Sequence, residues 1–349
     1  MNDIKSLLEK LSNAHGVSGR EGSVQQIIRG EIASYADEIR EDAIGNLIAI
    51  RKGEHPSIMI EAHADEIGLM VKFVDEKGFI RFIRIGGWFD QTLLNQRVII
   101  HAKFGPIFGV IGGKPPHVMK DEDKKKGVEA KDMFIDVGCQ SQKEVENLGI
   151  MPGTPISIDR RFVSLQGDRV TGKAFDNRAG VVVMIEALKR TKSKSNIYAV
   201  ATVQEEVGLK GAKVSAFGLD PDLALAADVT VPGDHPGIEM KDAAVEVGKG
   251  PVIAIADASG RGLIASPKVV EWLVETARQN SIAIQLEAAE GGTTDATAIH
   301  LTKAGIPTGV ISVATRYIHS PVEVLSVNDI NNAADLMARA LETAPNYFG

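Results

Sequence analysis

Continuous apolar strands alternate with helical segments in the first and last parts of the chain. The segments "SIMIEAHAD" (57–65), "NIYAVATV" (196–203) and "PTGVISV" (307–313) are apolar almost throughout. Strands of this kind are typical of a sheet that is buried on both faces. Segments with helical spacing, such as "NRAGVVVMIEALKR" (177–190) and "SVNDINNAADLMARALETA" (326–344), would cover it. The two ends of the chain therefore predict an α/β domain.

The middle of the chain has a different sequence pattern. Between residues 69 and 165 it contains short alternating strands, including "GFIRFIRI", "RVIIHAKF" and "FGVIGG", which glycines interrupt. Helical periodicity is scarce there, so a small β-rich domain is predicted. The expected organisation is one domain from residues 1–68 and 166–349, with residues 69–165 inserted as a second.

Composition narrows the functional classes. The net charge of -7 gives no general basic surface for nucleic acid. The single cysteine, Cys139, excludes an internal disulfide and a cysteine-based metal site, and we expect a free thiol. No stretch approaches the ~18 consecutive apolar residues of a membrane span, and the N-terminal segment is amphipathic rather than signal-like. We therefore expect a soluble cytoplasmic protein with no membrane partner.

Side chains that bind metals recur where the predicted buried strands end. Taken singly, each has an ordinary explanation: a histidine in an apolar strand is usually hydrogen-bonded in the core, and an aspartate before a helix usually caps it. In an open α/β sheet, however, the carboxyl ends of the strands form the crevice where ligands bind. The candidates are His63, Asp65, Glu205, Glu206, Asp228 and His319, together with Asp176 directly before a helix.

Several carboxylates in one crevice would repel one another by several kcal/mol unless cations lie among them. Imidazole mixed with carboxylate and no thiolate suits Zn²⁺, Co²⁺ or Mn²⁺ in a hydrolytic site. Two histidines and three carboxylates can give each of two ions one histidine and one private carboxylate, with the third carboxylate bridging. A fourth carboxylate is then left over, so one member of the Glu205–Glu206 pair could bind metal while its neighbour takes a proton from water.

Six ordered motifs resemble those of the M42 family of metallo-aminopeptidases, which includes tetrahedral (TET), deblocking and glutamyl aminopeptidases. The resemblance covers essentially the whole chain, including "GGKPPH" in the β-rich insertion. Any one motif alone would be a weak signal, but their order and spacing together are specific. The six motifs are "AHADEIG" (62–68), "GKAFDNRAG" (172–180), "VQEEVGLKGA" (203–212), "ADVT" (227–230), "GGTTDATAIH" (291–300) and "RYIHSPVE" (316–323).

The resemblance implies two divalent metal ions per subunit, Zn²⁺ or Co²⁺ with Mn²⁺ as a further possibility. His63 and Asp228 would bind one ion, and Glu206 and His319 the other. Asp176 would bridge the two ions.

The resemblance also implies roles for residues that are not metal ligands. Glu205 would be the general acid and base, and Asp65 would orient the His63 imidazole. Asp295 and His117 are weaker candidates for substrate binding; a loop-capping carboxylate and a turn-stabilising histidine are their structural alternatives. Asn177 stands where an aspartate is frequent, a neutral change that should leave the bridge intact.

The implied fold is a three-layer α/β catalytic domain with a mixed sheet and an inserted PDZ-like dimerisation domain. Dimers would assemble into a hollow tetrahedral dodecamer that admits peptides with a free N-terminus. A carboxypeptidase or deacylase with the same ligands stays open, as does an endoglucanase, a label that some family members have carried. A metal-stabilised protein without catalysis is disfavoured by the presence of Glu205. The preferred N-terminal residue stays open.

Overall fold

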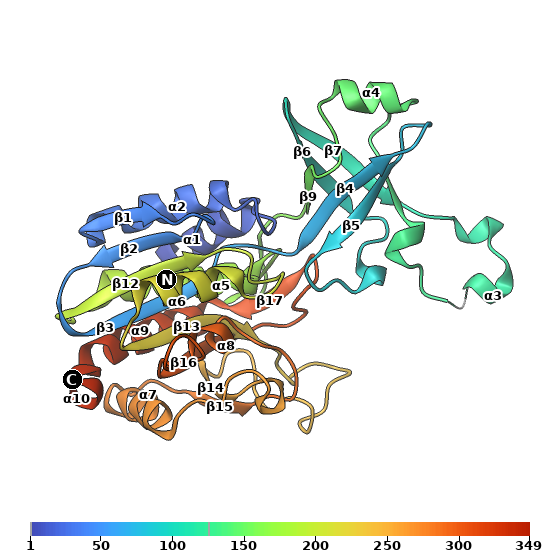
Figure 1. The fold of residues 1–349 in the computed structure, drawn as a ribbon. Coiled ribbons are helices and arrows are strands. Elements are labelled where there is room, and N and C mark those ends of the chain that lie inside the picture. Colours follow the sequence, from blue (N-terminus) through green and yellow to red (C-terminus); the bar gives the residue numbers. More distant parts are fainter. Residues whose placement is uncertain (1, 125) are drawn as a thin grey trace.

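A computed structural model describes residues 2–124 and 126–349. Its largest element is an eight-stranded sheet, and Figure 1 shows helices on both faces of it. In spatial order the strands are β1 (Glu38–Glu41), β2 (Leu47–Arg51), β12 (Ser195–Thr202), β3 (Glu54–His63), β13 (Leu223–Thr230), β16 (Thr308–Ala314), β14 (Val252–Ala256) and β15 (Gln285–Ala288).

The sheet is mixed, as the resemblance implied. Strands β12, β3, β13 and β16 run parallel at its centre, whereas β2 and β14 pair antiparallel with the flanks of this group. The four central strands are the apolar segments of the sequence, and they are buried along most of their length. Their carboxyl ends consequently lie along one edge of the sheet.

Helices cover both faces, so the predicted three-layer arrangement is confirmed. One face packs against the larger apolar core and the other against a smaller one. At the start of α7 (Pro267–Gln279), the Ser266 hydroxyl caps the helix by accepting a hydrogen bond from the Val269 amide. The larger core contains residues of α1 (Asn2–Asn13), α2 (Gly22–Ile32), α5 (Phe175–Arg190), α7 (Pro267–Gln279) and α9 (Val327–Thr343); the smaller one contains residues of α6 (Lys210–Leu219) and α8 (Ala296–Ile299).

The β-rich middle of the chain forms a closed antiparallel barrel with its own apolar core. Figure 1 shows it beside the sheet edge that carries the strand ends. Its strands are, in order, β4 (Gly68–Val74), β5 (Ile80–Ile85), β8 (Phe134–Asp136), β7 (Gly105–Gly112), β6 (Arg97–Ala102) and β9 (Pro155–Ile158), with helices α3 (Asp121–Lys124) and α4 (Gln142–Asn147) in its connections.

A three-stranded sheet pairs β10 (Val163–Ser164) and β11 (Arg169–Gly172), which follow the barrel, with β17 (Glu323–Ser326) from near the end of the chain. Helix α10 (Pro345–Phe348) follows α9. Cys139 is a half-buried free thiol. Among the described residues, no helix is long and apolar enough to cross a membrane.

Candidate metal centre and active site

The ends of the central strands bring the candidate side chains together. His63 is the last residue of β3 and pairs in register with Thr202, the last residue of β12. Asp228 lies two residues before the end of the adjacent β13. Asp176 reaches the same edge from the start of α5, which packs across β3 and β13.

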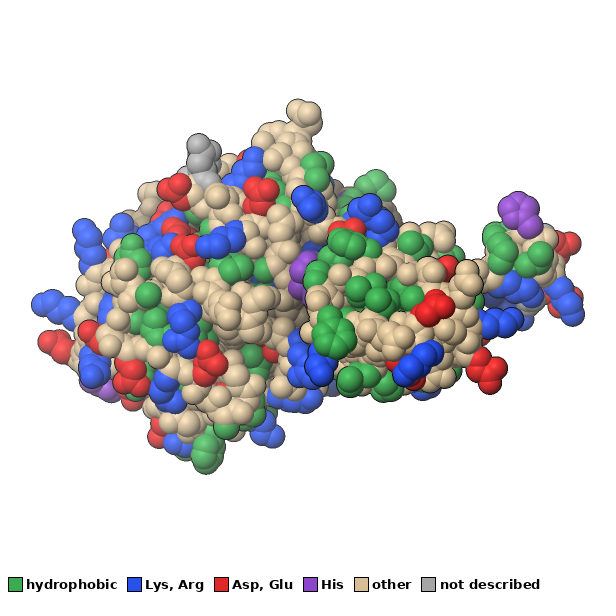
Figure 2. Space-filling model, turned by 90° about the horizontal axis from the view of Figure 1, so that it is seen from above, with side chains coloured by type: hydrophobic (Ala, Val, Ile, Leu, Met, Phe, Trp, Pro, Cys, Tyr) green, Lys and Arg blue, Asp and Glu red, His purple; other side chains and the backbone are tan. Residues whose placement is uncertain are grey.

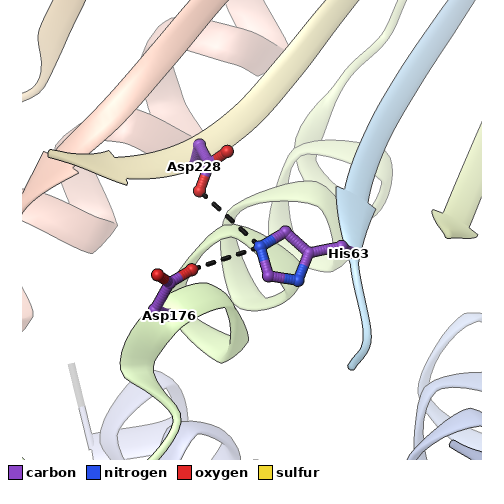
Figure 3. A group of neighbouring side chains, drawn as sticks. All are labelled: His63, Asp176 and Asp228. Atoms are coloured by element: carbon purple, nitrogen blue, oxygen red, sulfur yellow. Dashed lines mark ion pairs between the residues drawn. The ribbon is translucent and has the colours of Figure 1, made fainter. Parts of the chain in front are cut away.

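A buried group is formed by His63, Asp176 and Asp228. The His63 Nε2 atom lies 3.1 Å from Asp176 Oδ1 and 3.9 Å from Asp228 Oδ1, and Figure 3 shows both carboxylates facing this ring nitrogen. One ligand atom from each residue lies within 4.8 Å of the others, a spacing at which one ion could contact all three. We call this set the deep group.

A second set, the shallow group, is formed by Asp176, Glu206 and His319. The His319 Nε2 atom lies 3.2 Å from Asp176 Oδ2 and 3.2 Å from Glu206 Oε2. The His319 side chain is 37% exposed, whereas that of His63 is 2% exposed. Asp176 therefore directs one carboxylate oxygen to each group, which is the arrangement that a bridging ligand requires.

Glu205 belongs to neither group. Strand β12 ends at Thr202, so both glutamates lie in the loop before α6, and the opposite orientations imposed by a regular strand do not apply. The Glu205 Oε2 atom lies 3.8 Å from His63 Nε2, and Glu205 lines a cavity beside the cluster. The consecutive glutamates thus reach the same cluster, one inside a ligand group and one beside it.

Asp65 holds this loop in place. Its carboxylate accepts hydrogen bonds from the backbone amides of Glu205 (3.0 Å) and Glu206 (3.2 Å) and from the Ser18 hydroxyl (2.6 Å). Its Oδ1 atom also lies 3.5 Å from His63 Nδ1. Asp65 is positioned to orient the imidazole, and it also fixes the two glutamates, a contact that sequence reasoning did not anticipate.

Glu323 likewise holds two of the candidate ligands, Asp176 and His319, through their backbone amides. The sequence alone did not single it out. Its buried carboxylate accepts hydrogen bonds from the backbone amides of Asp176 and His319, each at 3.1 Å. His319 has a φ of 60°, in the left-handed region that few side chains adopt readily. The spacing "HSPVE" placed this carboxylate near His319 in sequence, but only the fold brings it to Asp176.

Asn177 ties α5 to the ligand strand. Its side chain accepts a hydrogen bond from the Gly180 amide (2.9 Å) and donates one to the Ala227 carbonyl (2.8 Å), one residue before Asp228. A Cβ atom on Gly180 would lie 2.4 Å from that carbonyl oxygen, so glycine permits the close approach of α5. Taken by itself, the position of Asp176 before a helix suggested a helix cap. Ala174 occupies the cap of α5 instead.

The buried carboxylates of the cluster favour the binding of cations. Burial would lower the pKa of His319, but hydrogen bonds to the Asp176 and Glu206 carboxylates raise it to about 11. Burial holds the pKa values of Glu205 and Asp228 well above their usual range, against the opposing effect of His63. The buried Glu206 Oε1 atom has no hydrogen-bond partner among the described residues. An unpartnered carboxylate oxygen among imidazoles fits divalent metal ions at both groups.

The barrel also reaches the cluster. Gly86 and Gly87 follow β5, and a Cβ atom on Gly87 would lie 2.8 Å from His319 Nδ1, while one on Gly86 would lie 3.3 Å from Glu206 Oε2. The two barrel glycines thus lie against the shallow group, and a larger side chain at either position would push against its ligands. The sequence motif "IGGW" gave no sign of this contact.

A cavity of about 1090 Å³ opens beside the cluster and is lined by Asp176, Glu205, Glu206, Asp228 and His319 among others. Asp295 is not among its lining residues; the residue is 1% exposed, and its carboxylate accepts a hydrogen bond from the Thr202 hydroxyl (2.6 Å). His117 is exposed on the short turn Pro116–Val118 and does not line the cavity either. Substrate binding by these two residues stays a prediction that their placement does not support.

Comparisons with known proteins agree with this geometry. The profile of the M42 glutamyl aminopeptidase family matches residues 45–336. The lysyl aminopeptidase of Pyrococcus furiosus is 34% identical over 96% of each chain. The structure of aminopeptidase APDkam598 from Desulfurococcus kamchatkensis is 45% identical, covers 99% of this chain and 97% of its own, and superposes with a TM-score of 0.95.

The TET1 peptidase of Pyrococcus horikoshii, which can assemble into a tetrahedron or a large octahedral shell, is 34% identical with a TM-score of 0.86. The similarity covers 97% of this chain and 99% of that one. Identity and fold both extend over nearly the full length, so the chain belongs to the M42 aminopeptidase family and is a peptide hydrolase.

Proposed function

We propose that the chain is a dinuclear metal aminopeptidase that removes N-terminal residues from peptides. The observation that supports this most directly is the position of Asp176 between two ligand groups, with Glu205 beside them and outside both. Metal binding alone does not require a fourth buried carboxylate at this point. A carboxylate next to the ions is what proton transfer in peptide hydrolysis requires.

The ions would be held by His63 and Asp228 in the deep group and by Glu206 and His319 in the shallow group, with Asp176 shared. Bound there, they would act as Lewis acids toward the substrate carbonyl and make water more acidic. Zn²⁺ or Co²⁺ fits the donor set best, and Mn²⁺ is compatible with it.

Glu205 carries the proton. It accepts one from the attacking water as the water oxygen bonds to the carbonyl carbon, and it donates that proton to the leaving nitrogen as the peptide bond breaks. Asp65 keeps Glu205 in reach through the backbone amide.

A substrate panel tests this function. Peptides with a free N-terminus and their N-acetylated forms would be assayed after chelation and after adding back Zn²⁺, Co²⁺ or Mn²⁺. We expect metal-dependent cleavage of the first residue from free peptides only. Cleavage that ignores N-acetylation would favour a deacylase, release from the carboxyl end a carboxypeptidase, and hydrolysis of cellulose an endoglucanase.

We further propose that the barrel, within residues 69–165, is a dimerisation domain and that dimers form a tetrahedral dodecamer. Exposed apolar side chains on the barrel support this: Figure 2 shows such side chains gathered on its upper face. Phe104 and Phe108 are 73% and 65% exposed, values unusual for phenylalanine in a monomer. Light scattering would give the mass of the particle, and Phe108→Asp should reduce it. Peptides are the expected partners, and a cytoplasmic location stays a prediction.

A further inference from the structure

One wall of the cavity is not used by the proposed catalytic groups. It runs from the end of β13 to β15, and Val229, Val231, Ile238 and Leu286 contribute apolar surface to it. The charged residues that line it outside the ligand groups are Lys241, Asp242, Asp257, Glu287 and Glu290. The wall is therefore apolar with an excess of carboxylates.

Glu287 is the carboxylate that is tied to the strand bearing Asp228. Its Oε2 atom accepts a hydrogen bond of 2.7 Å from the Thr230 hydroxyl. Thr230 follows Asp228 by two residues in β13, so both side chains point to the same side of the sheet, with their Cα atoms ~6.6 Å apart. The Glu287 carboxylate thus lies close to the metal cluster. A bound ligand with its Cα atom at that cluster could reach the carboxylate with a long side chain.

No cation in the part of the chain that the structure describes pairs with the charge of Glu287. Among the described residues, no lysine, arginine or histidine forms an ion pair with it, although burial makes its ionised form costly. Lys241, the basic residue of this wall, pairs instead with Glu239 at 2.7 Å on the surface. A cationic group from a ligand would supply the missing partner.

We propose that this wall receives the side chain of the substrate's N-terminal residue and that Glu287 selects lysine and arginine. Thr230 holds one Glu287 oxygen and leaves the other for the ammonium or guanidinium group. The aliphatic stem of such a side chain packs on apolar surface such as Val231 and Ile238. An acidic N-terminal residue would meet repulsion there, even though the family profile bears the name of glutamyl aminopeptidases.

The inference rests on the proposed aminopeptidase function and is tested with lysyl, leucyl and glutamyl p-nitroanilides. We expect kcat/KM of the native chain to be at least ~10-fold higher for lysyl than for glutamyl substrate. In Glu287→Gln, lysyl hydrolysis should fall by at least ~10-fold, while leucyl hydrolysis changes by less than ~3-fold. Leucyl activity in the same sample shows that the variant is folded.

A matched control is Glu290→Gln, which removes the same charge from an exposed position on the rim. It should change the ratio of lysyl to leucyl hydrolysis by less than ~3-fold, since an exposed charge is screened by solvent. Equal losses on both substrates in Glu287→Gln, or the same shift of the ratio in Glu290→Gln, would overturn the selection by Glu287. A native preference for glutamyl substrate would overturn it too.

A second measurement needs no variant. Free lysine and norleucine share an aliphatic stem, but only lysine carries the terminal ammonium group. Lysine should inhibit leucyl hydrolysis at a concentration at least ~10-fold lower than norleucine, and equal inhibition would overturn the inference. Both results leave the aminopeptidase function standing, because leucyl hydrolysis is itself the readout; that function fails separately if no substrate is cleaved after metal is added back.

Discussion

The deep and shallow groups use the same donor types on different supports. His63 and Asp228 belong to central strands of the sheet, whereas Glu206 and His319 lie in loops. The deep ligands are buried, and the shallow histidine is 37% exposed. Strand positions are fixed by the hydrogen bonds of the sheet, but loop positions must be fixed by other contacts.

The structure shows the contacts that fix the two loop ligands of the shallow group. Asp65 fixes Glu206 through its amide, Glu323 fixes His319 through its amide, and the barrel glycine Gly87 lies against the His319 ring. The shallow group therefore depends on more of the molecule than the deep one. We expect it to lose metal first and to be more sensitive to changes elsewhere.

The largest effect should come from Glu205, which stands outside both groups. Glu205→Gln keeps the size of the side chain and removes the base, so turnover should fall by at least ~10²-fold. Metal analysis should show the native content, because neither group loses a ligand. Near-native hydrolysis by this variant would remove Glu205 from the acid and base role.

The next effect separates the two groups directly. Asp228→Asn and Glu206→Gln each weaken one private ligand, and each should deplete the ion of its own group and reduce hydrolysis. Metal content would be measured after dialysis against increasing chelator. The native chain should release metal in two stages, and Glu206→Gln should lack the first stage only. If both variants lacked the same stage, the assignment of private ligands would be wrong.

A smaller effect is expected from the barrel. Gly87→Ala would place a methyl group 2.8 Å from His319 Nδ1, so the ring must shift. We expect metal affinity of the shallow group to fall by ~10-fold, the lower end of what displaced supporting contacts cost. Gly30→Ala is the control, since a Cβ atom there meets nothing within 4 Å. Native chelator sensitivity in Gly87→Ala would show that the barrel does not support this group.

The smallest effect concerns the junction that holds the barrel against the sheet domain. The Ser157 hydroxyl of β9 lies 2.8 Å from both His15 Nδ1 and His101 Nε2. Burial, with a contribution from the nearby Lys173 charge, lowers the pKa of His15 to about 4 from an ordinary 6.5. Between these values the unfolded chain binds the proton and the folded chain does not, so stability should fall as pH falls from 6.5 to 4.

His15→Gln does not titrate and should lose less stability over the same range. Thermal unfolding measured from pH 7 to pH 4 would show the native chain losing a few degrees more than the variant. Parallel curves for the two proteins would mean that His15 does not govern the acid sensitivity of this junction.

Much of the fold could be predicted because its signals are local. The central strands are apolar runs of the sequence, and Ser266 and Pro267 mark the start of α7 by their own chemistry. Strands β14 and β15 were missed because "VIAIA" and "QLEA" are too short for their patterns to distinguish a strand from other structure. The β-rich insertion was recognisable from its texture, but its closure into a barrel was not.

The candidate site divides in the same way. The donor types at the strand ends pointed to two metals and a free carboxylate, and five donors do meet in two groups. The link from Glu323 to Asp176 carried no signal because 147 residues separate the two, and Gly87 carried none because it acts by having no side chain. Asp295 shows the converse, because its motif suggested substrate contact and the fold buries its carboxylate against Thr202.

The sequence by itself determined the layered α/β architecture and the kinds of side chain at its functional edge, because apolar periodicity and residue chemistry are local properties. Tertiary structure alone decided that Asp176 turns one oxygen to each histidine and that Glu205 stays outside both groups. It also decided that Glu287 faces the cavity without an ion pair to any cation of residues 2–124 and 126–349. These depend on strand register, loop supports and the packing of the barrel, which join residues far apart in the chain.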